Sequence, residues 1–198
     1  TAILEQLCLI GCGLMDEYYA LALKRAGLVR RVVGYSKSPS TTERARQLGV
    51  IDVEAPSALL AVSGADLVLI AVPVAATEAT LKAIRHILTP EMLIMDVGST
   101  KAGVVQAARE VLREQVGSFV PAHPIAGLER GGIENADPDL YRDRQVILTP
   151  IERTRTHQLQ RAHAVWKAIG SHVSEMSPDA HDAAFAAVSH LPHVLAFA

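Results

Sequence analysis

The sequence has little cysteine, no long apolar run and no excess of one charge. Two cysteines, Cys8 and Cys12, stand among 198 residues. They are too few for a disulfide framework, and we expect both to be structural in a reducing compartment. The apolar stretches are broken by glycine, proline or charge and are too short to span a bilayer, and no signal peptide is recognisable. We therefore expect a cytoplasmic protein with no membrane segment.

The charges are balanced and dispersed. Lysine and arginine number 19 against 21 acids, a formal net charge of -2, so a clustered basic surface for nucleic acid is not expected. Hydrophobic residues make up 49% and charged residues 20%, which suits a packed core and argues against disorder. The length fits one domain, or one domain with part of another.

Short apolar runs alternate with segments of helical period. The runs that predict strands are Leu7–Ile10, Arg31–Tyr35, Leu67–Val72, Met92–Val97, Ser118–Pro121, Gln145–Thr149 and His172–Met176. The segments that predict helices are Leu14–Ala26, Thr41–Leu48, Ala76–Leu88, Lys101–Gln115 and Arg153–Ile169. This rhythm predicts an α/β fold: a doubly wound, Rossmann-like parallel sheet with helices on both faces. Ser99 or Thr100 is expected to cap the helix that begins at Lys101.

The last segment differs from the rest. Ser177, Pro178 and Asp179 form a helix start, with a cap, a proline at the first position and an acid near the positive end of the dipole. The helix carries apolar residues on more than one face and needs partners. We expect residues 1–176 to form a dinucleotide-binding domain and residues 177–198 to begin a truncated, all-α substrate and dimerisation domain. A terminal helix folded back on the sheet is the alternative.

A glycine turn follows the first predicted strand and opens the first predicted helix. Gly11 and Gly13 stand where a dinucleotide-binding turn must lie, and Leu14 and Met15 begin the helix. The first glycine allows the tight turn, the second lets the backbone approach a pyrophosphate, and helix amides hold the negative charge. We assign these four residues to cofactor binding.

The third glycine of this motif is replaced by Asp16, and Glu17 follows. Two interpretations stay open. The carboxylates either point outward and only stabilise the helix dipole, or they stand near the pyrophosphate and weaken its binding by repulsion and bulk.

The end of the second predicted strand bears on the choice of cofactor. An NAD site usually has an acid there for the ribose hydroxyls, whereas this chain has Ser36, Lys37 and Ser38. Their donors and positive charge suit a 2'-phosphate, so NADP is favoured over NAD, which stays possible. A solvated turn that ignores the phosphate is the alternative. Val72 and Pro73, at the end of the third predicted strand, complete the assigned cofactor residues.

Two compact histidine motifs carry a family resemblance. His123–Gly127 reads His-Pro-Ile-Ala-Gly, and Ser189–His193 reads Ser-His-Leu-Pro-His. The first lies just beyond a predicted strand, at the edge where ligands bind in open α/β sheets. Together with Gly11–Met15, Asp96–Lys101 and His181–Asp182, these motifs resemble the prephenate/arogenate (cyclohexadienyl) dehydrogenase family over nearly the whole chain.

The resemblance implies an oxidoreductase of tyrosine biosynthesis. In that family hydride leaves the hydroxyl-bearing ring carbon of prephenate or arogenate for a nicotinamide, the ring carboxylate departs as carbon dioxide, and the ring becomes aromatic. By motif position His123 is the catalytic residue that accepts the hydroxyl proton. Ser99 would hydrogen-bond the same hydroxyl or the histidine and orient it. The implied substrate-binding residues are Glu129, Ser189, His190 and His193. The family implies a homodimer in the full-length form, with no nucleic-acid or membrane partner, and we assign no metal site.

The chain also departs from the family pattern. Leu128 and Gly131 stand where polar residues are common, and the later helix with the carboxylate-binding arginine is not in this chain. Two alternatives stay open because fold does not determine function. One is another β-hydroxyacid-like or reductase member of the same fold, which should lack the paired histidine motifs. The other is a non-catalytic dinucleotide-fold module with lost cofactor binding.

Overall fold

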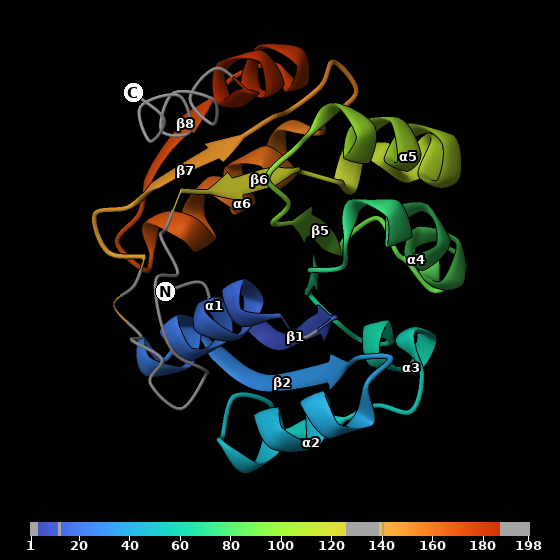
Figure 1. Ribbon diagram of the computed structural model, residues 1–198, viewed down its shortest axis with the longest axis vertical. Helices are drawn as coiled ribbons and strands as arrows, with labels where there is room; N and C mark the ends of the chain where they lie inside the picture. Colours follow the sequence, from blue (N-terminus) through green and yellow to red (C-terminus); the bar gives the residue numbers. More distant parts are fainter. Residues whose placement is uncertain (1–3, 12, 126–138, 140, 187–198) are drawn as a thin grey trace, which may run out of the picture.

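The computed structural model describes residues 4–11, 13–125, 139 and 141–186. Its centre is a five-stranded parallel sheet of order β3-β2-β1-β4-β5 (Figure 1). The strands are β1 Leu4–Ile10, β2 Val29–Tyr35, β3 Val53–Glu54, β4 Leu67–Ile70 and β5 Leu93–Asp96. The first four residues of the predicted strand Leu67–Val72 form β4, which lies between β1 and β5 inside the sheet. The predicted doubly wound parallel sheet is therefore confirmed.

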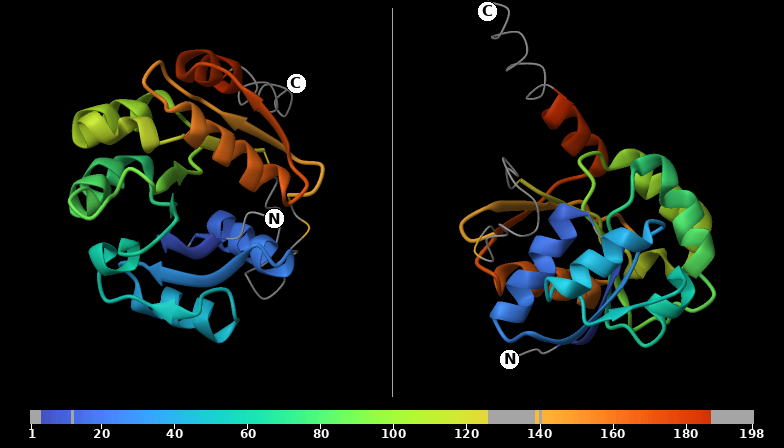
Figure 2. Two further views of the ribbon diagram at one scale, coloured as in Figure 1. Left: turned by 180° about the vertical axis from the view of Figure 1, so that it is seen from behind. Right: turned by 60° about the horizontal axis from the view of Figure 1, so that its bottom comes forward.

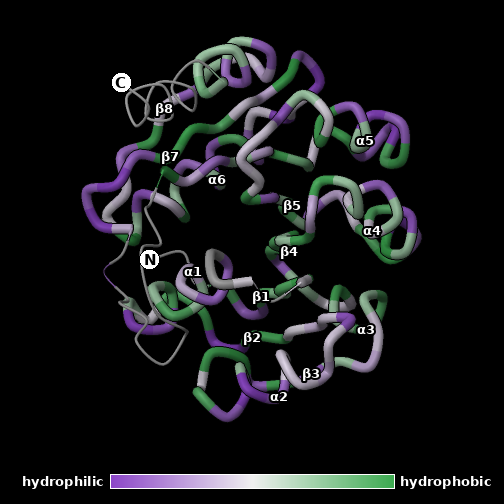
Figure 3. The backbone as a smooth tube through the Cα atoms, viewed as in Figure 1, coloured by the Kyte–Doolittle hydropathy of each residue, from purple (hydrophilic) through white to green (hydrophobic). Residues whose placement is uncertain are grey.

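Helices cover both faces of this sheet. They are α1 Leu14–Arg25, α2 Pro39–Gln47, α3 Ala58–Val62, α4 Thr77–Ile84, α5 Ala102–Leu112 and α6 Thr156–Lys167, with short 3-10 turns at Val74–Ala76 and Arg113–Ser118. Leu7 and Leu9 pack with α1 and α6 residues, whereas Cys8 and Ile10 pack with α3, α4 and α5 residues. This alternation buries both faces of β1. Figure 3 shows hydrophobic residues along β4, inside the sheet.

A second, three-stranded sheet extends the first. It contains β6 Ala122–Pro124, β7 Gln145–Leu148 and β8 His172–Glu175, with β6 antiparallel to β7 and β7 parallel to β8. The predicted strand Ser118–Pro121 is wrong: Ser118 lies in a 3-10 turn, and only Phe119 bridges to Ile94. Pro121 has no N–H with which to continue the ladder, and the chain leaves β5 to pair with β7 instead.

Two short elements escape sequence patterns. β3 has two residues and α3 has five, which is too short to display a period. Ser57 nevertheless caps α3, because its hydroxyl accepts the Leu60 N–H at 3.2 Å. β3 pairs with the end of β2, and α3 contributes Ala58 and Leu59 to the wall of the cavity described below.

The final helix of the described region spans residues 178–186. Its predicted start is confirmed, because Ser177 Oγ accepts the Ala180 N–H at 3.1 Å. It lies against the N-terminal end of α5 (Figure 2), where Asp182 accepts the N–H groups of Lys101 and Ala102. Among the helices of the described ranges, none is long and apolar enough to cross a membrane.

Candidate active site

A cavity of about 600 Å³ opens at the carboxyl ends of β1, β2 and β4. Its walls are mostly small and apolar. The lining residues are Ile10, Gly11, Tyr35, Ser36, Lys37, Ser57, Ala58, Leu59, Ala71, Val72, Pro73, Ala76, Ala79, Thr80 and Ala83. Five predicted cofactor residues are therefore in one cavity: Gly11, Ser36, Lys37, Val72 and Pro73. Ser38 is not among the lining residues; its hydroxyl lies 3.1 Å from that of Ser40.

Gly11 occupies a position that only glycine can fill. Its φ of 106° lies in the region that residues with a side chain rarely adopt, and an added Cβ would come within 2.4 Å of the Ala71 carbonyl oxygen. The turn after β1 therefore passes directly over the end of β4. Gly13 then precedes the first turn of α1, which Leu14 and Met15 begin. Helix N–H groups at this point are the usual partners of a phosphate.

The interpretation that Asp16 and Glu17 point outward is wrong. Asp16 is fully buried and Glu17 is 4% exposed. Asp16 lies on the inner side of α1, near the buried Cys8 thiol. Burial raises the pKa of this thiol, and the negative charge of Asp16 raises it further. Burial also raises the pKa of Glu17, to about 7, and the positive charge of Arg44 opposes this shift.

The residues at the end of β2 carry no acid. Lys37 is exposed at the rim of the cavity, and Ser36 Oγ accepts the Ser38 N–H at 3.1 Å. No Asp or Glu is found among the described residues that line the cavity. Small apolar walls suit the adenosine half of a dinucleotide.

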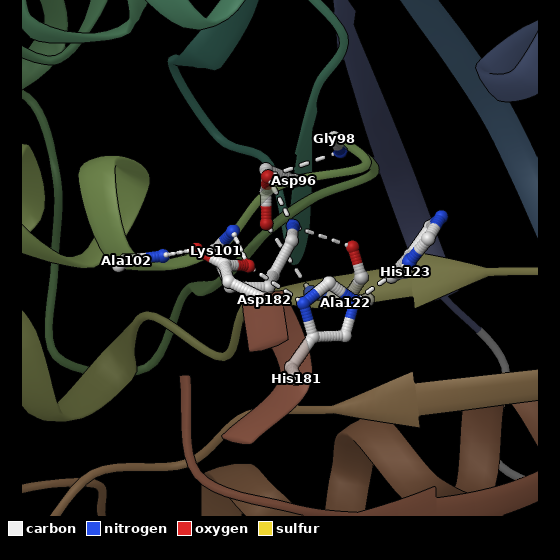
Figure 4. Close-up of polar contacts among 8 residues, drawn as sticks. All are labelled: Asp96, Gly98, Lys101, Ala102, Ala122, His123, His181 and Asp182. Carbon is white, nitrogen blue, oxygen red and sulfur yellow. Dashed lines mark hydrogen bonds and ion pairs between the residues drawn. The ribbon is translucent and has the colours of Figure 1, made fainter. Parts of the chain in front are cut away.

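A buried ion pair stands at the same edge, between β5 and β6 (Figure 4). Lys101 Nζ donates to Asp96 Oδ2 at 2.6 Å and to the Ala122 carbonyl at 2.7 Å. Asp96 also accepts the N–H of Ala122 at 3.2 Å and of Gly98 at 3.1 Å. Burial lowers the pKa of Lys101, while the Asp96 charge partly opposes this. The pair fixes β6 beside the end of β5.

His123 projects from β6 and begins a chain of three side chains. Its Nδ1 is 2.7 Å from Nε2 of His181, and Nδ1 of His181 is 2.8 Å from Asp182 Oδ1. His181 is fully buried and His123 is partly exposed. Burial lowers the pKa of His123 to about 4, with His181 and Lys101 adding to the shift and Asp182 opposing it. His123 is therefore a neutral imidazole at neutral pH.

The predicted cap of α5 by Ser99 or Thr100 is wrong. Ser99 and Thr100 are exposed, and the Asp182 carboxylate accepts the N–H groups of Lys101 at 2.8 Å and Ala102 at 2.9 Å instead. A carboxylate at this end also complements the helix dipole. The cap comes from about eighty residues further along the chain, where a local motif search does not look.

The structure brings His123 and the loop that holds Ser99 to one sheet edge, as expected from the order of motifs. Within the described ranges, no hydrogen bond joins Ser99 to His123. Glu129, Ser189, His190 and His193 lie outside the described residues. The sequence motif His181–Asp182 does not by itself predict that these two residues lie beside His123, about sixty residues earlier in the chain. Across the part of the chain that the structure describes, no group of three or more His, Cys, Asp or Glu could hold a metal ion.

The geometry agrees with comparisons to known proteins. The family model described as "Prephenate dehydrogenase, nucleotide-binding domain" matches residues 19–175. The chain belongs to this family. The match begins after the glycine turn, so the turn is supported by its own geometry rather than by the family match.

Individual members of the prephenate dehydrogenase family align over nearly the whole chain. Prephenate dehydrogenase of Bacillus subtilis (strain 168) is 36% identical over 193 residues, which are 97% of this chain and 52% of the relative. Cyclohexadienyl dehydrogenase of Zymomonas mobilis subsp. mobilis is 34% identical over 195 residues, 98% of this chain and 66% of the relative. The chain thus spans between half and two thirds of the length of these two relatives.

A solved relative gives the same result in three dimensions. Prephenate dehydrogenase from A. aeolicus, in complex with hydroxyphenyl propionate and NAD+, superposes with a TM-score of 0.87 at 34% identity. The superposition covers 98% of this chain and 67% of that one. The fold of the described residues is therefore that of a prephenate dehydrogenase nucleotide-binding domain.

Proposed function

We propose that the protein containing this chain catalyses the NAD(P)-dependent oxidative decarboxylation of prephenate, arogenate or both. The observation that carries the proposal is the neutral His123 imidazole at the same sheet edge as the glycine-turn cavity. Relatives named prephenate, cyclohexadienyl and arogenate dehydrogenases support the reaction class.

The cavity suits the adenosine half of the cofactor, with Gly11 leaving room for the close approach of backbone and pyrophosphate. Lys37 and the absence of an acid among the described lining residues favour NADP over NAD. When bound, the nicotinamide supplies the acceptor for hydride. The A. aeolicus relative was solved with NAD+, so NAD use by this chain is the second possibility to be measured.

His123 accepts the proton of the substrate hydroxyl as the C–H electron pair leaves as hydride, so the hydroxyl carbon becomes a carbonyl carbon. The bond between the ring and its carboxylate then breaks. Its electron pair enters the ring, carbon dioxide leaves, and the ring becomes a phenol when protonated His123 returns its proton to the oxygen. Ser99 stays the predicted orienting partner of the hydroxyl or of His123. Glu129, Ser189, His190 and His193 stay the predicted substrate-binding residues.

The remaining expectations belong to the same proposal. Residues 1–176 would form the dinucleotide-binding domain, and residues 177–198 would begin a helical domain that completes the pocket and pairs two subunits. The helix at 178–186 supports this division, because Asp182 and His181 on it contact the α5 loop and His123.

The test is turnover by the complete protein with four combinations: prephenate or arogenate, each with NADP+ or NAD+. Reduced nicotinamide is followed by absorbance, and carbon dioxide is measured in parallel. We expect both products in equal amounts with at least one substrate, and a higher kcat/KM with NADP+. Binding of a dinucleotide without turnover of either substrate would favour another reductase of this fold. Absence of both binding and turnover would favour a non-catalytic module.

A further inference from the structure

The helix at residues 178–186 supplies two side chains that determine how His123 is held. His181 is fully buried, and its ring meets that of His123 edge to face at 4.9 Å between centroids. Phe185 contacts both rings, with centroids 4.9 Å from His123 and 4.7 Å from His181. The two imidazoles are therefore packed as well as hydrogen-bonded, and rotation of His123 would break contacts on two sides.

The hydrogen bonds of this group have one consistent direction. The Asp182 carboxylate can only accept, and it accepts the N–H groups of Lys101 and Ala102 as well as a proton from His181 Nδ1. His181 Nδ1 therefore carries hydrogen, and in the neutral ring its Nε2 carries a lone pair. That lone pair must accept from Nδ1 of His123, 2.7 Å away. The Nε2 of neutral His123 is then left with a lone pair.

We propose that His181 and Asp182 are positioning residues that hold His123 in the Nδ1–H tautomer, with the Nε2 lone pair directed toward the substrate hydroxyl. The inference rests on the proposed function. Figure 4 shows the other ring nitrogen of His123 directed away from His181. Because Asp182 also caps α5, the same carboxylate links the tautomer of His123 to the register between α5 and the helix at 178–186.

Ring ¹⁵N chemical shifts test the tautomer directly, since protonated and unprotonated imidazole nitrogens give well-separated signals. The complete protein is labelled at histidine, and the His123 signals are assigned by their loss in His123→Asn. At neutral pH we expect Nδ1 to be protonated and Nε2 to be unprotonated. A protonated Nε2 in the neutral ring would overturn the proposal, whatever the turnover.

A matched pair of variants separates positioning from packing. His181→Gln keeps a carbonyl oxygen that can reach the place of Nε2 and accept from His123, whereas His181→Leu has similar bulk and no acceptor. We expect His181→Gln to keep the Nδ1–H tautomer and most of kcat. We expect His181→Leu to mix the tautomers and to lower kcat about ten- to a hundredfold, with little change in the KM for dinucleotide.

Asp182→Ala provides an independent measurement. Alanine at this place leaves the Nδ1–H of His181 without its acceptor, so the His123 tautomer should again become mixed. Unfolding followed by Trp166, the single tryptophan, checks that each variant is folded. Wild-type kcat and an unchanged tautomer in both folded His181→Leu and folded Asp182→Ala would overturn the proposal. Absence of turnover in the wild type would instead overturn the proposed function, while the chemical shifts would still decide the tautomer.

Discussion

Replacing Lys101 by methionine tests the buried Lys101–Asp96 ion pair, which holds β6, the strand that carries His123, beside β5. Lys101 is fully buried, and its Nζ is 2.6 Å from Asp96 Oδ2 and 2.7 Å from the Ala122 carbonyl. Methionine keeps the apolar stem but leaves Asp96, itself 4% exposed, without its cation. Breaking a buried pair by removing one partner costs about 3–5 kcal/mol, so we expect the free energy of unfolding to fall by that amount.

Urea unfolding followed by the fluorescence of Trp166 measures this loss. Trp166 is the single tryptophan, is fully buried and lies 4.4 Å from the Tyr19 ring, so its signal should report the core. With a urea m-value of about 2 kcal/mol per molar, the midpoint should fall by about 2 M.

The matched control is Lys82→Met. Lys82 pairs with Glu78 at 3.1 Å on the surface of α4, where both side chains are more than half exposed. An exposed helix pair of this spacing contributes about 0.3–0.5 kcal/mol. If Lys101→Met cost no more than Lys82→Met, the reasoning about the buried pair would be refuted. Adding Asp96→Asn to Lys101→Met should recover part of the loss, because the unpaired buried charge is then removed.

Four further outcomes are expected. Gly11→Ala should lower the free energy of unfolding, measured in urea, by at least about 1 kcal/mol more than Gly27→Ala does. Both glycines have a positive φ, but only at Gly11 would the added Cβ meet a carbonyl oxygen, at 2.4 Å. Equal losses would contradict this close approach. Lys37→Glu should raise the Kd for NADP+, measured by calorimetry, at least about tenfold and change the Kd for NAD+ far less. If the two Kd values changed equally, Lys37 would not contact the 2'-phosphate. Because burial, His181 and Lys101 lower the pKa of His123 from 6.5 to about 4, kcat/KM should fall only as pH drops through about 4. The contribution of His123 to the free energy of unfolding should decline as pH falls from 6.5 toward 4. In this range His123 binds a proton in the unfolded chain but not in the folded chain. A kcat/KM midpoint at 6.5 would refute this environment.

The parallel sheet and the sheet edge of the site follow from local patterns in the sequence. The apolar run at Leu67 is long enough to reveal a strand buried on both faces, and Gly11 stands between a strand and a helix that are each several residues long. The ends of parallel strands meet at one edge, so the order of motifs along the chain already predicts that the glycine turn and His123 share it.

The contacts within the site depend on residues that are distant in the chain. Asp182 caps α5 from about eighty residues away, and Ser99, the local candidate, is exposed. A carboxylate in the first turn of a helix can face either the solvent or the sheet, so the burial of Asp16 depends on how α1 packs on the sheet. Pattern alone could not decide either case, because both are settled by tertiary packing.

The most direct test of the account is the turnover of His123→Asn in the complete protein, with the better of prephenate and arogenate as substrate. Asparagine keeps a hydrogen-bonding side chain but cannot take a proton near neutral pH. We expect kcat to fall about 10²–10⁴-fold, the usual loss when a general base is removed, while the Kd for dinucleotide stays nearly unchanged. If the variant retained more than about a third of wild-type kcat, far above what loss of a general base allows, His123 would not be the proton acceptor.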